Sequence, residues 1–249
     1  MANERVKHVR VADTLADDLR TRIFSGALKD GRLPPQHQLA EEAGVGLVSV
    51  REALRILESE GLIFIKRGNQ GGAEIRRPDP RTASFSLGLV LQSTGTTLAE
   101  LSAALRAFEP YCARMCAGSD DCAQIADELE HINDELSGLI DDANGFTPAA
   151  RRFHARLVEL CPNRAVALVV QSLVDLWSIQ EDQWARRMND ARAYPGPKYR
   201  IDVVSVHGRL IQAIRDGDED EAERTASSHL HATQLYVMQG REPEGVRVT

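Results

Sequence analysis

The chain has 249 residues, of which 43% are apolar but only 5% aromatic, enough for two modest domains with largely aliphatic cores. It has no run of 18 or more apolar residues and no apolar core of a signal peptide near its start, so no membrane partner is expected. The net charge is −7, but residues 1–77 carry +2 and the rest −9, which indicates two parts with different tasks.

Cysteine usage indicates the compartment. Cys112, Cys116, Cys122 and Cys161 are too few for a disulfide framework at this length. A reducing compartment is the simplest setting, so we expect a cytoplasmic protein. Cys112 and Cys116 lie one helical turn apart and could form a soft-metal pair, although buried apolar packing is the commoner role of such cysteines.

The N-terminal part contains three helical patterns. Thr14 and Asp17 resemble a capping box and predict the start of the first helix. Two further helices are predicted at 36–43 and 47–60, and a glycine follows each of the three.

Two short β-like runs follow the third helix. Residues 62–66 and 73–76 are joined by RGNQGG, whose glycines favour a hairpin. Three helices followed by a two-stranded wing is the plan of a winged helix-turn-helix. We therefore predict a DNA-binding domain of this fold over residues 1–77.

The remainder of the chain is predicted to be helical, which makes the protein mainly α. Residues 78–96 form an expected linker and connecting helix, because two prolines stiffen RRPDPRT ahead of an apolar run. Residues 97–240 are expected to form an all-α antiparallel helical bundle. Within it, Thr97 and a Thr-Pro pair at 147–148 predict helix starts. Residues 241–249 are expected to be a disordered tail.

Several motifs resemble a known family. LRTRIFSGALKDGRLPPQHQLAEEAGV, VREALRILESEGLI and RGNQGGAEI resemble the GntR family of bacterial transcription regulators. FHARLVELCPN, followed by His207 and His229, resembles the subfamily that carries an FCD effector domain. The resemblance covers about residues 10–239. It implies a homodimeric regulator, most simply a repressor, that binds double-stranded operator DNA and responds to a small molecule bound by residues 97–240.

The end of the third helix that should meet the bases has few hydrogen-bonding side chains. GntR relatives usually carry a capping hydroxyl and an arginine where this chain has Gly46 and Leu47. Arg51 matches the arginine of the family's VREAL motif and is the first contact we expect. The expected DNA-binding residues are Arg51, Arg55, Ser49, His37, Leu47, Val48, Lys66, Arg67, Asn69 and Gln70.

Two alternatives remain open for this helix. Arg51 and Arg55 could instead form a solvated face that pairs with Glu52 and Glu58. The apolar residues at 47–48 can contact a thymine methyl group, or they can mean that DNA binding is weak. In the second case the protein would be a sensing module with weakened DNA binding.

Three histidines are candidate metal ligands. His154, His207 and His229 lie on the apolar faces of three predicted helices, and imidazole is the commonest ligand for zinc, nickel and similar ions. The resemblance implies an Asp-x-x-x-His pattern before two further histidines, but this chain has Ala150 at the aspartate position. We expect a divalent metal, zinc or nickel, held with reduced affinity. The missing oxygen would come from water, the effector or another side chain; alternatively, the histidines bind an anionic effector without metal.

Three other residues are candidate effector contacts. Arg106 lies where the family often has an arginine near the effector, and a cation there would suit a carboxylate. Glu109 accompanies it in LRAFEP, and Asn163 follows the histidine helix as in the family. The alternatives are a surface ion pair between Arg106 and Glu109, and a helix cap at Asn163.

A metal-dependent hydrolase is the competing functional class, because three histidines with a bound water can be a catalytic arrangement. No general base lies at a recognisable spacing from the histidines, and a hydrolase would leave the winged helix without a task. We therefore do not expect an enzyme.

Overall fold

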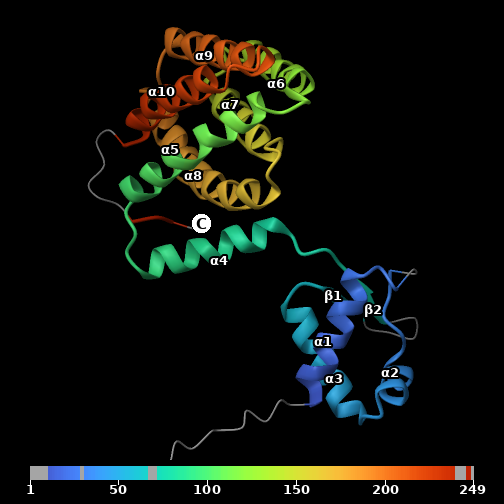
Figure 1. Ribbon diagram of the computed structural model, residues 1–249. Coiled ribbons are helices and arrows are strands. Elements are labelled where there is room, and N and C mark those ends of the chain that lie inside the picture. The colour runs from blue at the N-terminus through green and yellow to red at the C-terminus, as the bar shows by residue number, and fades with distance from the viewer. Residues whose placement is uncertain (1–10, 29–30, 67–71, 239–244, 248–249) are drawn as a thin grey trace, which may run out of the picture. The chain divides into compact units, whose positions relative to one another are not determined.

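The computed structural model describes residues 11–28, 31–66, 72–238 and 245–247 (Figure 1). They divide into two compact units, Met1–Asp79 and Pro80–Thr249, each with its own hydrophobic core.

The first unit is a winged helix-turn-helix, as the sequence predicts. Leu19 and Leu57 are fully buried where the first and third helices pack together, and Leu39 joins them from the second. The first helix is already formed at Val11, so Thr14 lies inside it and the capping box predicted there is wrong. The elements are α1 (Val11–Phe24), α2 (Gln36–Ala43), α3 (Leu47–Ser59), β1 (Ile63–Lys66) and β2 (Gly72–Ile75).

The wing is an antiparallel ribbon. Ile63 pairs with Ile75 and Lys66 with Gly72, and residues 67–71 lie outside the described residues. Glu74 on β2 binds Arg32 at 2.7 Å and approaches Lys66 at 3.6 Å. The first ion pair connects the segment before α2 to β2, and the second lies between the two strands of the wing.

The second unit consists of helices, in agreement with the predicted helical bundle. Its elements are α4 (Pro80–Ser93), α5 (Leu98–Ala117), α6 (Cys122–Ser137), α7 (Ala143–Glu159), α8 (Arg164–Asp190), α9 (Pro197–Arg215) and α10 (Glu219–Met238). Helix α10 packs along α5, α7 along α8, and α6 along α9, while α4 lies on α8 (Figure 1). Among the described residues, no helix is long and apolar enough to cross a membrane.

Of the two helix starts predicted in this unit, one is confirmed and one is wrong. Thr97 and Glu100 form the predicted capping box at the start of α5. The start predicted at 147–148 is wrong, because Asp142 caps α7 one turn earlier by accepting a hydrogen bond from the backbone N–H of Asn144. Thr147 is instead buried inside the helix, where its hydroxyl hydrogen-bonds Tyr194.

The C-terminal segment is partly ordered, which corrects the expectation of a disordered tail over 241–249. Gly245 pairs with Thr97 in an isolated β-bridge, and the backbone N–H of Val246 donates to the carbonyl oxygen of Thr96 at 2.9 Å. The side chain of Val246 is only 1% exposed and belongs to the core formed by α5 and α8. Residues 245–247 are therefore part of the second unit, and the rest of the predicted tail lies outside the described residues.

Replacing Val246 with alanine is expected to lower the free energy of unfolding of the second unit by about 1.5 kcal/mol, because it removes two buried methyl groups. Urea denaturation followed by circular dichroism measures the change. Val169→Ala is the matched control, since that valine is 59% exposed and its truncation should have little effect. Equal effects of the two substitutions would contradict the packing of the tail.

Candidate DNA-binding surface and three-histidine site

Helix α3 has one buried face and one exposed face. Val50, Ala53, Leu54 and Leu57 are buried in the core of the first unit. Gly46 occupies the N-cap with an extended backbone, and no side chain caps the helix. The helix start therefore presents free backbone N–H groups, which can bind a phosphate.

The exposed face of α3 carries the residues predicted to contact DNA. Arg51 and Arg55 are exposed, and neither has an acidic partner within the described ranges. The Arg51 Nε donates to the carbonyl oxygen of Leu47 at 3.3 Å. Glu58, a partner considered for these arginines, instead accepts a hydrogen bond from the backbone N–H of Ile65 on β1. Both guanidinium groups are therefore available to an anionic ligand.

The remaining candidates lie around the same end of α3. Leu47 is 46% exposed and Val48 is 73% exposed, so both can meet a base edge; Ser49 is partly buried in the first turn. His37 is exposed in the first turn of α2, whereas Lys66 faces Glu74 on the wing. Arg67, Asn69 and Gln70 lie outside the described residues.

Introducing at positions 46 and 47 the hydroxyl and the arginine that the family resemblance implies should strengthen DNA binding. The double variant Gly46→Ser/Leu47→Arg is expected to bind DNA about tenfold more tightly, because a new arginine at the helix start can reach phosphate or guanine. Position 46 has open space for a Cβ atom, and Leu47 is not part of the core. Fluorescence anisotropy with labelled DNA measures the change. Gly46→Ser alone is the control, and equal affinities of the two variants would show that Leu47 does not face DNA.

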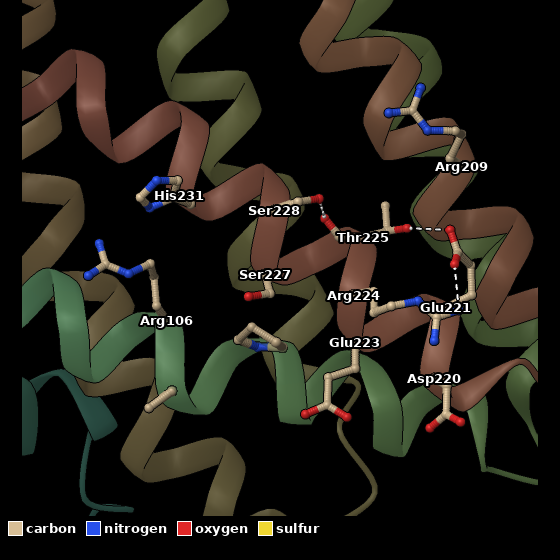
Figure 2. Close-up of a pocket in the computed structure, with 12 residues that line it drawn as sticks. Arg106, Arg209, Asp220, Glu221, Glu223, Arg224, Thr225, Ser227, Ser228 and His231 are labelled. Atoms are coloured by element: carbon tan, nitrogen blue, oxygen red, sulfur yellow. Dashed lines mark hydrogen bonds and ion pairs between the residues drawn. The ribbon is translucent and has the colours of Figure 1, made fainter.

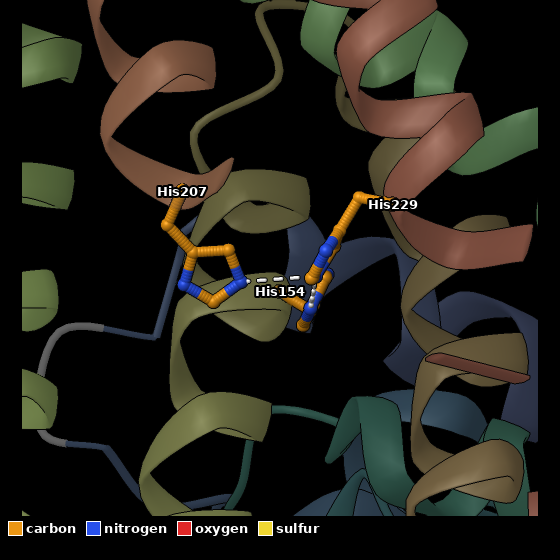
Figure 3. A group of neighbouring side chains, drawn as sticks. All are labelled: His154, His207 and His229. Atoms are coloured by element: carbon orange, nitrogen blue, oxygen red, sulfur yellow. Dashed lines mark hydrogen bonds between the residues drawn. The ribbon is translucent and has the colours of Figure 1, made fainter. Parts of the chain in front are cut away.

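The three predicted metal ligands converge in the second unit (Figure 3). His154 on α7, His207 on α9 and His229 on α10 each offer a ring nitrogen, and these nitrogens lie within 4.8 Å of one another. The Nε2 atom of His229 is 3.1 Å from Nε2 of His207 and 3.3 Å from Nε2 of His154. Phe153 stacks on the ring of His207 at a centroid distance of 3.8 Å and fixes its plane.

The two distances from Nε2 of His229 fit a shared cation. Two nitrogens bound to one ion at about 2.1 Å lie about 3.0 Å apart in octahedral and about 3.4 Å apart in tetrahedral coordination. Burial lowers the pKa of His207 and His229 well below the ordinary value, so both rings stay neutral, as metal ligands must. The donor set, three imidazoles without a thiolate, suits zinc or nickel.

Glu109 lies beside this cluster, and not at the surface. Its side chain is almost fully buried, and its Oε1 atom is 2.6 Å from Nδ1 of His154. Burial acts to lower the pKa of His154, but the charge of Glu109 and its hydrogen bond outweigh this effect and raise that pKa. The surface ion pair considered between Arg106 and Glu109 is therefore wrong, and Glu109 interacts with the histidines.

The other two predicted effector contacts lie elsewhere. Arg106 donates hydrogen bonds to Ser102 and Gln234 and lines a surface groove of about 920 Å³ beside α10 (Figure 2). The groove has mixed charge, with Arg209 and Glu221 among its other lining residues. Asn163 caps α8 by accepting from two backbone N–H groups, which agrees with the simpler alternative for this residue.

Two charged residues near the histidines were not found from the sequence. Glu181 on α8 is partly buried, and burial raises its pKa while His154 and Arg151 act in the opposite direction. Arg151 on α7 donates to the carbonyl oxygen of Ser178 and pairs with Asp182 at 3.2 Å. In the sequence, Glu181 could have been found as a charged residue on the apolar helix face that also carries Trp177 and Trp184.

The winged helix-turn-helix followed by a helical bundle is the plan of a DNA-binding transcription regulator. Residues 11–71 match the family of bacterial regulatory proteins known as gntR, and residues 100–232 match the FCD domain. The chain belongs to the GntR family and carries an FCD effector-binding domain.

Individual relatives agree with this assignment. The chain is 29% identical over 232 residues to a protein described as an L-lactate dehydrogenase operon regulatory protein of Escherichia coli (strain K12), covering 89% of this chain and 84% of the relative. It is also 29% identical to the transcriptional repressor NanR of Enterobacter sp. (strain 638), covering 90% and 84%. A solved structure of Streptococcus agalactiae GntR matches with a TM-score of 0.67 at 20% identity, covering 90% of this chain and 98% of that one, and supports the fold. The family and these relatives are transcription regulators, so the hydrolase alternative is not retained.

Proposed function

We propose that this protein is a homodimeric, cytoplasmic repressor that binds operator DNA through α3 and the wing and releases it when a carboxylate effector binds at a metal ion in the second unit. The observation that carries the effector part of this proposal is the convergence of three Nε2 atoms from three helices. The relation to NanR, which is named as a repressor, supports the direction of regulation.

The protein side of the proposed effector site consists of His154, His207 and His229. Each would present its Nε2 lone pair to zinc or nickel, while the packing of α7, α9 and α10 sets the spacing of the rings. When bound, the ion would act as a Lewis acid that attracts a carboxylate and leaves coordination positions for it. Ala150 stands at the position where the resemblance implies a carboxylate, and its methyl group cannot bind a metal ion.

Sensing then requires two sites that influence each other. An effector held between α7, α9 and α10 would bias their packing, and a dimer would convert that change into a new spacing of its two α3 helices. Thermodynamic linkage demands that DNA weakens effector binding by the same factor by which the effector weakens DNA binding.

Gel-shift titration with the DNA upstream of the protein's own gene tests this function. The zinc-loaded protein should shift this DNA specifically, and a panel of small hydroxy, amino and sugar acids should contain at least one that reverses the shift. A specific shift that no acid reverses, whether or not metal is present, would contradict the effector part of the proposal. Absence of any specific shift would favour a sensing module with weakened DNA binding.

A further inference from the structure

The three-histidine cluster lacks a carboxylate at the position one turn before His154. Ala150 occupies that position, and it packs against an apolar group that includes Tyr199, Val203 and Val204. A cation held by three neutral imidazoles alone would have no nearby compensating anion from this part of α7. A compensating carboxylate must therefore come from another helix around the cluster.

Glu109 on α5 is the carboxylate that touches the cluster. Its side chain is 2% exposed, and Oε1 lies 2.6 Å from Nδ1 of His154. The Nε2 atom of the same ring faces His229. Because Nδ1 and Nε2 lie on different edges of an imidazole ring, Glu109 is outside the space where the three Nε2 atoms meet.

This contact determines which nitrogen of His154 can bind a cation. An ionised carboxylate only accepts hydrogen bonds, so Nδ1 of His154 must be the donor. The neutral ring then keeps its lone pair on Nε2, which is the atom directed at the other histidines. The arrangement of carboxylate, histidine and metal is the usual way in which proteins orient an imidazole ligand and raise its basicity.

Glu109 also has one oxygen without a partner in the surrounding protein. Its second oxygen, Oε2, is buried and has no hydrogen-bond partner among the described residues. Arg106, one turn away on the same helix, is directed to Ser102 and Gln234. A buried carboxylate with an orphaned oxygen is costly unless a positive charge lies nearby. A divalent ion on the far side of His154 would supply that charge.

We propose that Glu109 replaces the absent aspartate as the anionic partner of the three-histidine site, acting through His154 as a positioning residue. This inference rests on the metal binding proposed above. Because Glu109 touches His154 and not the ion, the compensating negative charge would lie outside the coordinating atoms. The coordination position that an aspartate would occupy would then stay open for the effector.

Zinc affinity of purified variants, measured by competition with a chromogenic chelator, tests the role of Glu109. Glu109→Gln keeps the shape and removes the charge, and it is expected to weaken zinc binding about 10- to 100-fold, as loss of such partners typically does. Glu128→Gln is the matched control. It removes a carboxylate that pairs with Arg156 on α7 without touching a histidine, and its affinity should stay at the wild-type value.

Introducing the missing acid provides a second readout. Ala150→Asp should strengthen zinc binding more in the Glu109→Gln background than in the wild type, because the two carboxylates would compensate the same charge. A purely structural role of Glu109 would give equal gains in the two backgrounds. Equal gains would therefore overturn the inference, as would wild-type zinc affinity in Glu109→Gln.

A measurement on the unmodified protein covers the case in which Glu109→Gln does not fold. Long-range proton–nitrogen NMR correlations of the histidine rings should show His154 protonated at Nδ1, with Nε2 shifted on addition of zinc. Protonation at Nε2 in the zinc-loaded protein would overturn the inference. Failure of the wild type to bind zinc would contradict the proposed metal site itself, whereas zinc binding unaffected by the charge of Glu109 would contradict this inference alone.

Discussion

Arg51→Ala is expected to weaken operator binding by about 1–3 kcal/mol, roughly tenfold to a hundredfold. Arg51 is exposed on the outer face of α3 and has no acidic partner within the described ranges. Its guanidinium is thus available to phosphate or to a guanine edge. Fluorescence anisotropy at several salt concentrations measures both the affinity and its salt dependence, and loss of one phosphate contact should reduce the slope of log K against log salt by about 1.

Arg186→Ala is the control for this experiment, because it removes the same charge from an exposed arginine on α8 of the second unit. Its operator affinity should stay close to that of the wild type. An Arg51→Ala protein with unchanged affinity and unchanged salt slope would remove Arg51 from the DNA-binding residues. A loss of affinity without a change of slope would indicate a contact to a base and not to a phosphate.

Removing metal from the protein is expected to produce the second large effect. At a free zinc concentration one hundred times its dissociation constant, binding should stabilise the folded state by about 2.7 kcal/mol. Chelation should therefore lower the melting temperature, and added zinc should restore it. In His229→Ala the zinc-dependent shift should disappear, because loss of one of three protein ligands is expected to weaken binding roughly a hundredfold.

His231→Ala is the matched control for the metal experiment. His231 is exposed on the same helix, two residues from His229, and contributes nothing to the cluster. It should respond to zinc like the wild type. Differential scanning fluorimetry with and without zinc compares the variants, and a zinc shift that persists in His229→Ala would contradict the three-histidine site.

Helical periodicity was sufficient to predict much of this fold and part of the site. The spacing of apolar residues around His154, His207 and His229 correctly placed all three on inward faces, because side-chain direction in a helix follows from its 3.6-residue period. Their convergence at 3.1–3.3 Å depends on the packing of α7, α9 and α10, which periodicity alone cannot give.

The failures have a common cause. The sequence offers Glu109 as an effector contact or as a surface partner of Arg106, yet α7 lies against α5 and gives Glu109 a histidine as its partner. Val246 lies in REPEGVRVT, for which the sequence predicts a disordered tail, although the core of α5 and α8 has a place for its side chain. In both cases a tertiary contact outweighed the local pattern.

The bridge between Thr97 and Gly245 has a consequence for synthesis of the chain. It joins the residue that caps α5 to a segment that is synthesised after all the helices of the second unit. The core of the first unit lies within Met1–Asp79 and can form while the rest is still being made, as N-terminal domains commonly do. A nascent chain can therefore complete its DNA-binding unit before the unit that would respond to a ligand is closed.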